Sequence, residues 1–144
     1  MEDYQAAFLQ RHQDQIILDK NNRRIASMHL GGIVIECLLK RMIMASLPRN
    51  ASQEWKTDSN NPGHTIKNPG HDLQSALKCH NRLYSRVKNF PQVIQWINIV
   101  EQRPQGHFID LRYDGSEANQ KDYDDWLLAY KSLIGWLKKQ ATQF

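Results

Sequence analysis

Cysteine, glycine and proline are scarce in this chain, which has two cysteines, seven glycines and five prolines among 144 residues. Cys37 and Cys79 fall within helical patterns without a short spacing between them, which argues against a disulfide-rich secreted scaffold and favours free thiols in a reducing cytoplasm. Long apolar runs are absent too, because charged residues interrupt the longest one, around residues 33–44, so it predicts no membrane span. We therefore expect a cytoplasmic protein with no membrane contact that forms one domain over residues 1–144.

Several signatures of catalytic and metal sites are also absent. The chain contains no phosphate-binding glycine loop, no GxSxG turn and no H-x-x-x-H or C-x-x-C pair. The histidines and cysteines between residues 64 and 80 match no spacing typical of metal ligands. The sequence therefore predicts neither a metal ion nor a cofactor.

Apolar residues recur at helical spacing through most of the chain. Either Asn21 or Asn22 is expected to cap the second helix, because its side-chain oxygen can accept an orphan backbone N–H. Residues 48–70 read as a long loop with turn formers in two copies of the phrase Asn-Pro-Gly-His, and Trp55 is expected to cover the core. The sequence predicts an all-α, up-and-down bundle of about five helices, over residues 3–19, 23–46, 71–87, 91–102 and 123–141.

The central helix carries three features that a buried helix normally avoids. His29 and Glu36 lie on one face of it, and Gly31–Gly32 stand between them. Glycine weakens a helix, and a buried carboxylate is costly unless it is paired. We expect a polar seam in which Glu36 pairs with Arg112 or His71, while the glycines admit a neighbouring helix or a second subunit. The seam either fixes the packing of the helices or forms part of a ligand or catalytic site.

Charge is distributed unevenly along the chain. Residues 78–88 contain no acid, whereas residues 110–125 contain six. A charge run of this kind is either a solvated face or a contact surface for a partner such as nucleic acid. The candidate contact residues are Lys78, Arg82, Arg86 and Lys88, the first three of which are spaced four apart and so share a face of a continuous helix.

Arg24 and His29 form a possible catalytic pair at the start of the central helix. An arginine and a histidine on successive turns can hold a phosphate and move a proton during RNA cleavage. The spacing alone is weak evidence for a catalytic pair, because an arginine five residues before a histidine arises readily by chance.

Three phrases resemble the HEPN superfamily, small helical domains found with minimal nucleotidyltransferases in prokaryotes. They are ASMHLGGIVIECLLKRMI, which includes Glu36 and Lys40; GHDLQSAL, with His71 at its helix start; and LRYDG, with the Arg112–Tyr113 pair. The resemblance covers roughly residues 21–135. It adds Tyr113 to the polar seam of His29, Glu36, His71 and Arg112.

The resemblance implies a helical bundle that forms homodimers. Known roles in the superfamily are RNA-cleaving toxins of toxin–antitoxin pairs, partners of nucleotidyltransferases, and non-catalytic binders of nucleotides or nucleic acid. The toxins carry an arginine, four to six residues and a histidine, with a polar residue after the arginine and a position late in the domain. Here Arg24 is followed by Ile25 and lies early, whereas Arg103 and His107 lie later but are separated by too few residues.

Three functions follow as hypotheses. The first is a non-catalytic, homodimeric module that binds nucleic acid, a nucleotide or a nucleotidyltransferase partner. The second is a metal-independent endoribonuclease that uses Arg24 and His29. The third is a purely structural or assembly protein whose polar residues specify packing.

Overall fold

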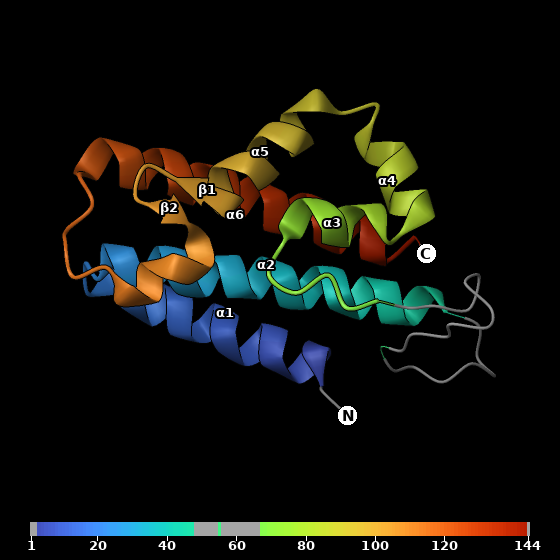
Figure 1. Ribbon diagram of the computed structural model, residues 1–144, viewed down its shortest axis with the longest axis horizontal. Coiled ribbons are helices and arrows are strands. Elements are labelled where there is room, and N and C mark those ends of the chain that lie inside the picture. Colours follow the sequence, from blue (N-terminus) through green and yellow to red (C-terminus); the bar gives the residue numbers. More distant parts are fainter. Residues whose placement is uncertain (1–2, 48–54, 56–66, 144) are drawn as a thin grey trace.

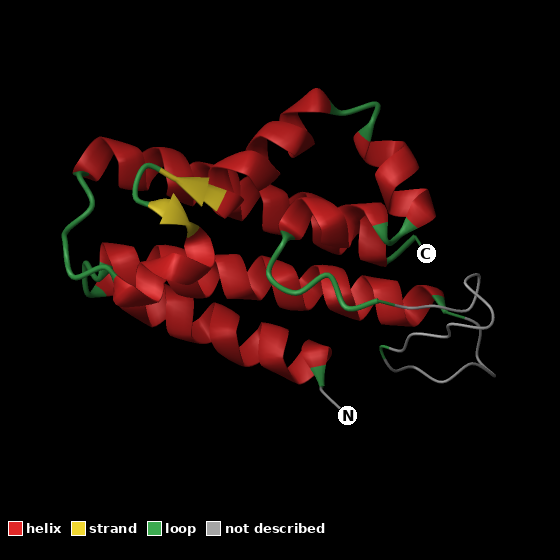
Figure 2. Ribbon diagram, viewed as in Figure 1, coloured by secondary structure: helices red, strands yellow, loops and turns green. Residues whose placement is uncertain are grey.

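Helix dominates the protein, as the periodicity predicts (Figure 2). The computed structural model describes residues 3–47, 55 and 67–143. The all-α class is confirmed, although the described residues form six α-helices and one 3-10 helix rather than about five helices. The elements are α1 (Tyr4–Lys20), α2 (Arg24–Ser46), α3 (Leu73–Lys78), α4 (Asn81–Val87), α5 (Pro91–Glu101), β1 (Gln102–Arg103), β2 (Gly106–His107), the 3-10 helix η2 (Phe108–Tyr113) and α6 (Gln120–Ala141).

The first two helices are joined by a tight turn at Asn21 and Asn22. The prediction that one of these asparagines caps α2 is wrong, because both close α1 instead. Asn22 has a left-handed φ of 56°, and the backbone N–H of Arg23 donates to Leu18 O at 2.9 Å. This pattern is a Schellman motif, in which a left-handed residue satisfies the last carbonyls of a helix. It leaves Arg23 as the N-cap of α2, without a side-chain capping hydrogen bond.

The core lies around α2, of whose 23 residues 14 are buried. Helix α1 packs along α2, and η2 and α6 contact other parts of it (Figure 1). The largest fully buried side chains include Trp126, Tyr130 and Phe108. Trp126 packs against Gly31 and Phe108 packs against Gly32. The sequence predicts that the glycines admit either a neighbouring helix or a second subunit, and the structure shows segments of the same chain beside them.

The helix predicted over residues 71–87 is interrupted. Helix α3 ends at Lys78, and His80 leaves the helical conformation, with φ −112° and ψ 98°. Its imidazole Nδ1 accepts the backbone N–H of Leu83 at 3.1 Å and so caps α4. At the other end of α3, Asp72 is the N-cap, and its side chain accepts the backbone N–H of Ser75 at 3.0 Å.

A short hairpin and the 3-10 helix connect α5 to α6. Strand β1 pairs antiparallel with β2, and Gly106 has the positive φ, 128°, that this turn requires. Helix η2 follows directly, and its buried residues Phe108 and Leu111 are three apart, the period of a 3-10 helix.

Most of the predicted loop over residues 48–70 lies outside the described residues, including the first Asn-Pro-Gly-His phrase. Trp55 is described: it is half-buried against the core, and its Nε1 donates to the Tyr4 hydroxyl at 2.6 Å. It therefore occupies the covering position that the sequence predicts. Within the described part of the chain, no helix combines the length and the apolar character that crossing a membrane requires.

Candidate functional site

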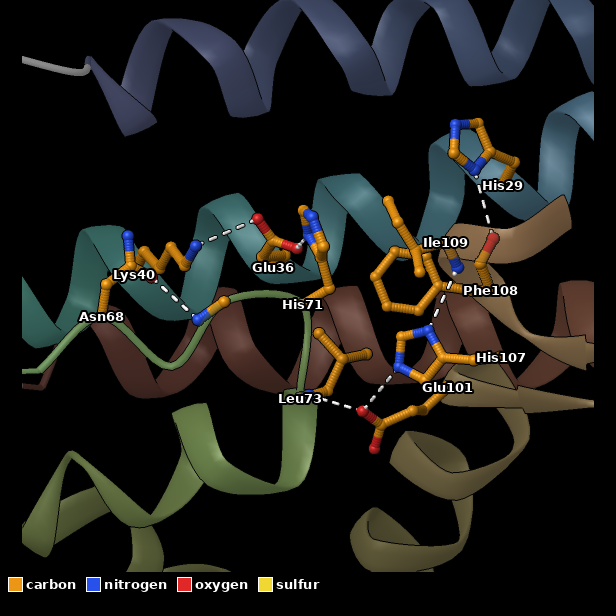
Figure 3. Close-up of polar contacts among 11 residues, drawn as sticks. His29, Glu36, Lys40, Asn68, His71, Leu73, Glu101, His107, Phe108 and Ile109 are labelled. Carbon is orange, nitrogen blue, oxygen red and sulfur yellow. Dashed lines mark hydrogen bonds and ion pairs between the residues drawn. The ribbon is translucent and has the colours of Figure 1, made fainter. Parts of the chain in front are cut away.

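Glu36, on which the predicted polar seam centres, is only 8% exposed and contacts His71 and Lys40 (Figure 3). His71 Nδ1 lies 2.6 Å from one carboxylate oxygen, and Lys40 Nζ lies 3.1 Å from the other. His71 was one of the two partners predicted for Glu36. Lys40, itself 4% exposed, was missed, although a glutamate followed by a lysine four residues later is the favoured ion-pair spacing on a helix.

A second histidine–carboxylate pair lies beyond the first, where α5 meets β2 (Figure 3). Glu101 is 3% exposed and accepts the backbone N–H of Leu73 at 2.6 Å. Its carboxylate also lies 3.2 Å from His107 Nε2, while His107 Nδ1 accepts the N–H of Ile109 at 3.2 Å. A neutral His107 with its proton on Nε2 satisfies both contacts. The pair therefore ties α3, α5 and η2 together.

His29 lies farther toward the N-terminus of α2 and holds η2 in place. Its Nδ1 is 3.1 Å from the backbone oxygen of Phe108, and because a carbonyl oxygen only accepts, Nδ1 carries the proton. In a neutral ring, Nε2 then has a free lone pair. His29 also lines a cavity, so this arrangement could serve as a general base.

The cavity has a volume of about 670 Å³ and lies between the first turns of α2 and residues 111–118. Three arginines line it, Arg23, Arg24 and Arg112, together with the carboxylates Asp114 and Glu117. A hydrogen bond from the Ser116 side chain lowers the pKa of Asp114, so this carboxylate is charged at neutral pH. The lining therefore has a small excess of positive charge.

Arg24 and His29 thus line one cavity, as the catalytic hypothesis requires, but the Arg24 guanidinium already has protein partners. Its Nη1 donates to the backbone oxygen of Ala118 at 3.0 Å, and its Nη2 donates to the Gln120 side chain. These contacts fasten the start of α6 to α2. Arg24 is therefore in part a structural residue.

Arg112 and Tyr113 are not brought to Glu36, in contrast to the predicted seam. The Arg112 guanidinium lies over the Tyr113 ring, 4.8 Å from its centroid, and Arg112 lines the cavity beside His29. Tyr113 is 78% exposed. Of the predicted set, only Glu36 is buried; His29 is half-buried, and His71 reaches Glu36 with a side chain that is 51% exposed.

The second arginine–histidine pair does not converge on a common point. Arg103 Nη1 donates to the backbone oxygen of Ile99 at 2.7 Å, whereas His107 faces Glu101. Burial lowers the pKa of Arg103, and the charges of Asp122 and Asp125 act in the opposite direction. Arg103 and His107 therefore serve the packing of the hairpin.

The predicted basic residues occupy two helices instead of one. Lys78 ends α3, and the break at His80 means that the four-residue spacing places only Arg82 and Arg86 on one helix face. Arg86 Nη1 donates to the Gln140 side chain at 2.6 Å, which joins α4 to the end of α6. Lys88 Nζ lies 4.6 Å from the centroid of the Tyr84 ring.

The segments that carry these basic residues, and the part of α6 that packs against them, contain no acidic residue. Residues 73–100 and 126–143 contain no aspartate or glutamate. The two segments pack together, since α5 contacts α6 and Phe90 meets Trp136 with ring centroids 6.0 Å apart. They carry seven basic residues, here called the basic surface: Lys78, Arg82, Arg86, Lys88, Lys131, Lys138 and Lys139. Lys138 lies on the side of α6 toward α1, since its Nζ is 5.6 Å from the centroid of the Phe8 ring.

The described residues contain no group of three histidine, cysteine or acidic side chains arranged to hold a metal ion. Cys37 is buried and Cys79 is exposed, and neither forms a disulfide bond. Comparison of the chain with protein-family models, with curated proteins and with solved structures found no match.

Proposed function

We propose that this protein is a HEPN-like, up-and-down helical module that binds nucleic acid through its basic surface. One observation carries the proposal: two packed segments with seven basic residues contain no acid. Lysine and arginine bind phosphates mainly through charge, and the release of counterions from the nucleic acid drives the association. A neighbouring carboxylate would oppose that attraction, so its absence over such a stretch favours a polyanionic ligand.

Binding fits the geometry better than catalysis does. The Arg24 guanidinium, which the toxin chemistry needs at the scissile phosphate, donates to Ala118 and Gln120. The homodimer and the nucleotidyltransferase partner implied by the resemblance remain part of the proposal. Because Trp126 and Phe108 occupy the space beside Gly31 and Gly32, a dimer would use another surface, and light scattering over a range of concentrations tests it.

The test compares two triple variants with the same loss of charge. Lys78, Arg82 and Lys88 are changed to alanine in the first, which leaves Arg86 to hold Gln140. Arg11, Lys20 and Lys121, which are exposed and lie outside both the basic surface and the cavity, are changed in the second. Fluorescence anisotropy with a labelled single-stranded RNA at low salt should show an affinity loss of about tenfold or more for the first triple variant only. Equal affinities for the wild type and the first triple variant would refute the proposal.

The cavity supports a second candidate, a metal-independent endoribonuclease, because Arg24, Arg112 and His29 all line it. His29 Nε2 would accept the proton of a ribose 2′-hydroxyl, and the 2′-oxygen would attack the phosphorus. The 5′-oxygen would leave and take a proton from water, while the arginines offset the charge that develops on the phosphate.

RNA cleavage in the presence of EDTA distinguishes this candidate from a binding module. His29→Asn is the informative variant, because its amide can still donate to Phe108 O but has no counterpart of Nε2. His29→Ala removes both groups. Cleavage by the wild type, together with its loss in both variants, would establish the enzyme. Intact RNA in all three samples would reject it, and a protein that also fails to bind RNA would be the structural or assembly protein of the third hypothesis.

A further inference from the structure

An aromatic pair is exposed within the basic surface, where α5 begins beside α6. Phe90 is 42% exposed, and Trp136 on α6 is half-buried. Their ring centroids are 6.0 Å apart and their planes form an angle of 60°. One ring thus meets the edge of the other, and part of the Phe90 ring remains open to solvent.

Helix capping gives no reason for a phenylalanine at this position. Phe90 is the N-cap of α5, where serine, threonine, aspartate and asparagine are favoured, and it makes no side-chain capping hydrogen bond. The residue before it, Asn89, is of a capping type. The exposed ring therefore weakens the helix start relative to the available alternatives, which is a reason to look for a role outside the fold.

Basic residues lie close in sequence to both rings. Lys88 is two residues before Phe90, and Lys139 is one turn after Trp136 on the same side of α6. Arg86 is bonded to Gln140, the next residue along α6. Aromatic rings beside cations, with no acid in either segment, match the chemistry of a nucleic acid strand whose bases are accessible.

We infer that Phe90 and Trp136 form a stacking platform for unpaired bases, with Lys88 and Lys139 beside the phosphates. This inference rests on the proposed function and makes it more specific: the ligand is single-stranded, because the bases of a duplex are already stacked and paired and cannot reach the rings. Every base has an aromatic face, so the platform has little sequence preference.

The test uses a single-stranded RNA of about 12 uridines and an RNA duplex of about 12 base pairs as probes. Phe90→Ser supplies a favoured N-cap residue, so thermal stability should be unchanged or raised. Its affinity for the single strand should nevertheless fall roughly fivefold or more, with the affinity for the duplex unchanged. Trp136→Leu should behave in the same way toward the RNAs, and Trp136→Tyr should retain most of the affinity.

Ile94→Ser is the matched control, because Ile94 is also 42% exposed and lies one helical turn after Phe90 but has no ring. Stacking predicts that this variant binds the single strand like the wild type. An equal loss in Ile94→Ser and Phe90→Ser would mean general apolar contact and overturn the platform. The platform would also be overturned if Phe90→Ser lost affinity for vesicles containing phosphatidylserine while it kept the wild-type affinity for RNA.

The two proposals fail in different ways. If Phe90→Ser binds the single strand as the wild type does, while the variant of Lys78, Arg82 and Lys88 loses affinity for both probes, the platform is wrong and the basic surface stands. If the wild type binds neither probe, both proposals are wrong.

Discussion

Phe108 lies directly against the backbone of Gly32. A Cβ atom added at Gly32 would come within 2.7 Å of Phe108 Cε2, and one added at Gly31 would come within 2.6 Å of Trp126 Cη2. The two adjacent glycines thus let η2 and α6 approach α2 more closely than any side chain would permit. The packing that this close approach allows offsets the low helix propensity of the two glycines.

Gly32→Ala should therefore destabilise the protein by about 1–3 kcal/mol, because the added methyl group overpacks the contact with Phe108. The gain in helix propensity, about 1 kcal/mol, works in the opposite direction and does not remove the clash. Gly135→Ala on α6 is the control, since no atom lies within 4 Å of its added Cβ. Urea denaturation should show the first variant less stable than the wild type and the second equally or more stable.

The Glu36–Lys40 ion pair is buried, so removal of one partner leaves a charge without compensation. Glu36→Gln should cost about 3–5 kcal/mol of unfolding free energy. Lys40→Met should cost less, because Glu36 retains His71 at 2.6 Å. The double variant Glu36→Leu, Lys40→Met should recover most of the loss, since it removes both buried charges. Full stability of Glu36→Gln in urea denaturation would show that the pair does not hold the seam.

His80 makes the stability of α4 depend on pH. Burial, aided by the charge of Arg82, lowers its pKa from the ordinary value of 6.5, although its own backbone acts in the opposite direction. Below about pH 6.5 the unfolded chain binds a proton that the folded chain takes up only at lower pH, so the unfolding free energy falls as the pH drops.

His80→Asn keeps a capping oxygen and removes this titration. Between about pH 7 and about pH 5 it should lose less unfolding free energy than the wild type. Burial also lowers the pKa of His12, but that residue is present in both proteins, so the difference between them reports on His80. Parallel stability curves for the two proteins would contradict this account.

The sequence predicts the long helices well because their signals are local. Apolar periodicity outlines α1, α2, α5 and α6, and Pro91 begins α5 at its favoured first position. The break between α3 and α4 was missed because histidine is not a usual capping residue, whereas here the buried His80 imidazole accepts the N–H of Leu83. The two-residue strands are too short for an alternating pattern to be visible.

Contacts of the candidate site could be predicted only for a charged residue that the sequence places in an apolar stretch, because such a residue needs a partner. Glu36 stands in an apolar stretch, so the need for His71 or another partner could be inferred. Glu101 ends a helix, and its contact with Leu73 joins residues 28 apart in the chain, a relationship that no local spacing encodes. The sequence predicted only the basic residues between positions 78 and 88. The lysines of α6 lie close to that segment only because α5 packs against α6.

The most direct test of the account is the salt dependence of RNA binding. For a single strand, the slope of log affinity against log salt concentration is about −0.7 for each phosphate contact. The variant of Lys78, Arg82 and Lys88 should have a slope shallower than the wild type by about 2, whereas that of Arg11, Lys20 and Lys121 should keep the wild-type slope. Identical slopes for all three proteins, or a shallower slope only in the second variant, would show that the basic surface does not bind the phosphates.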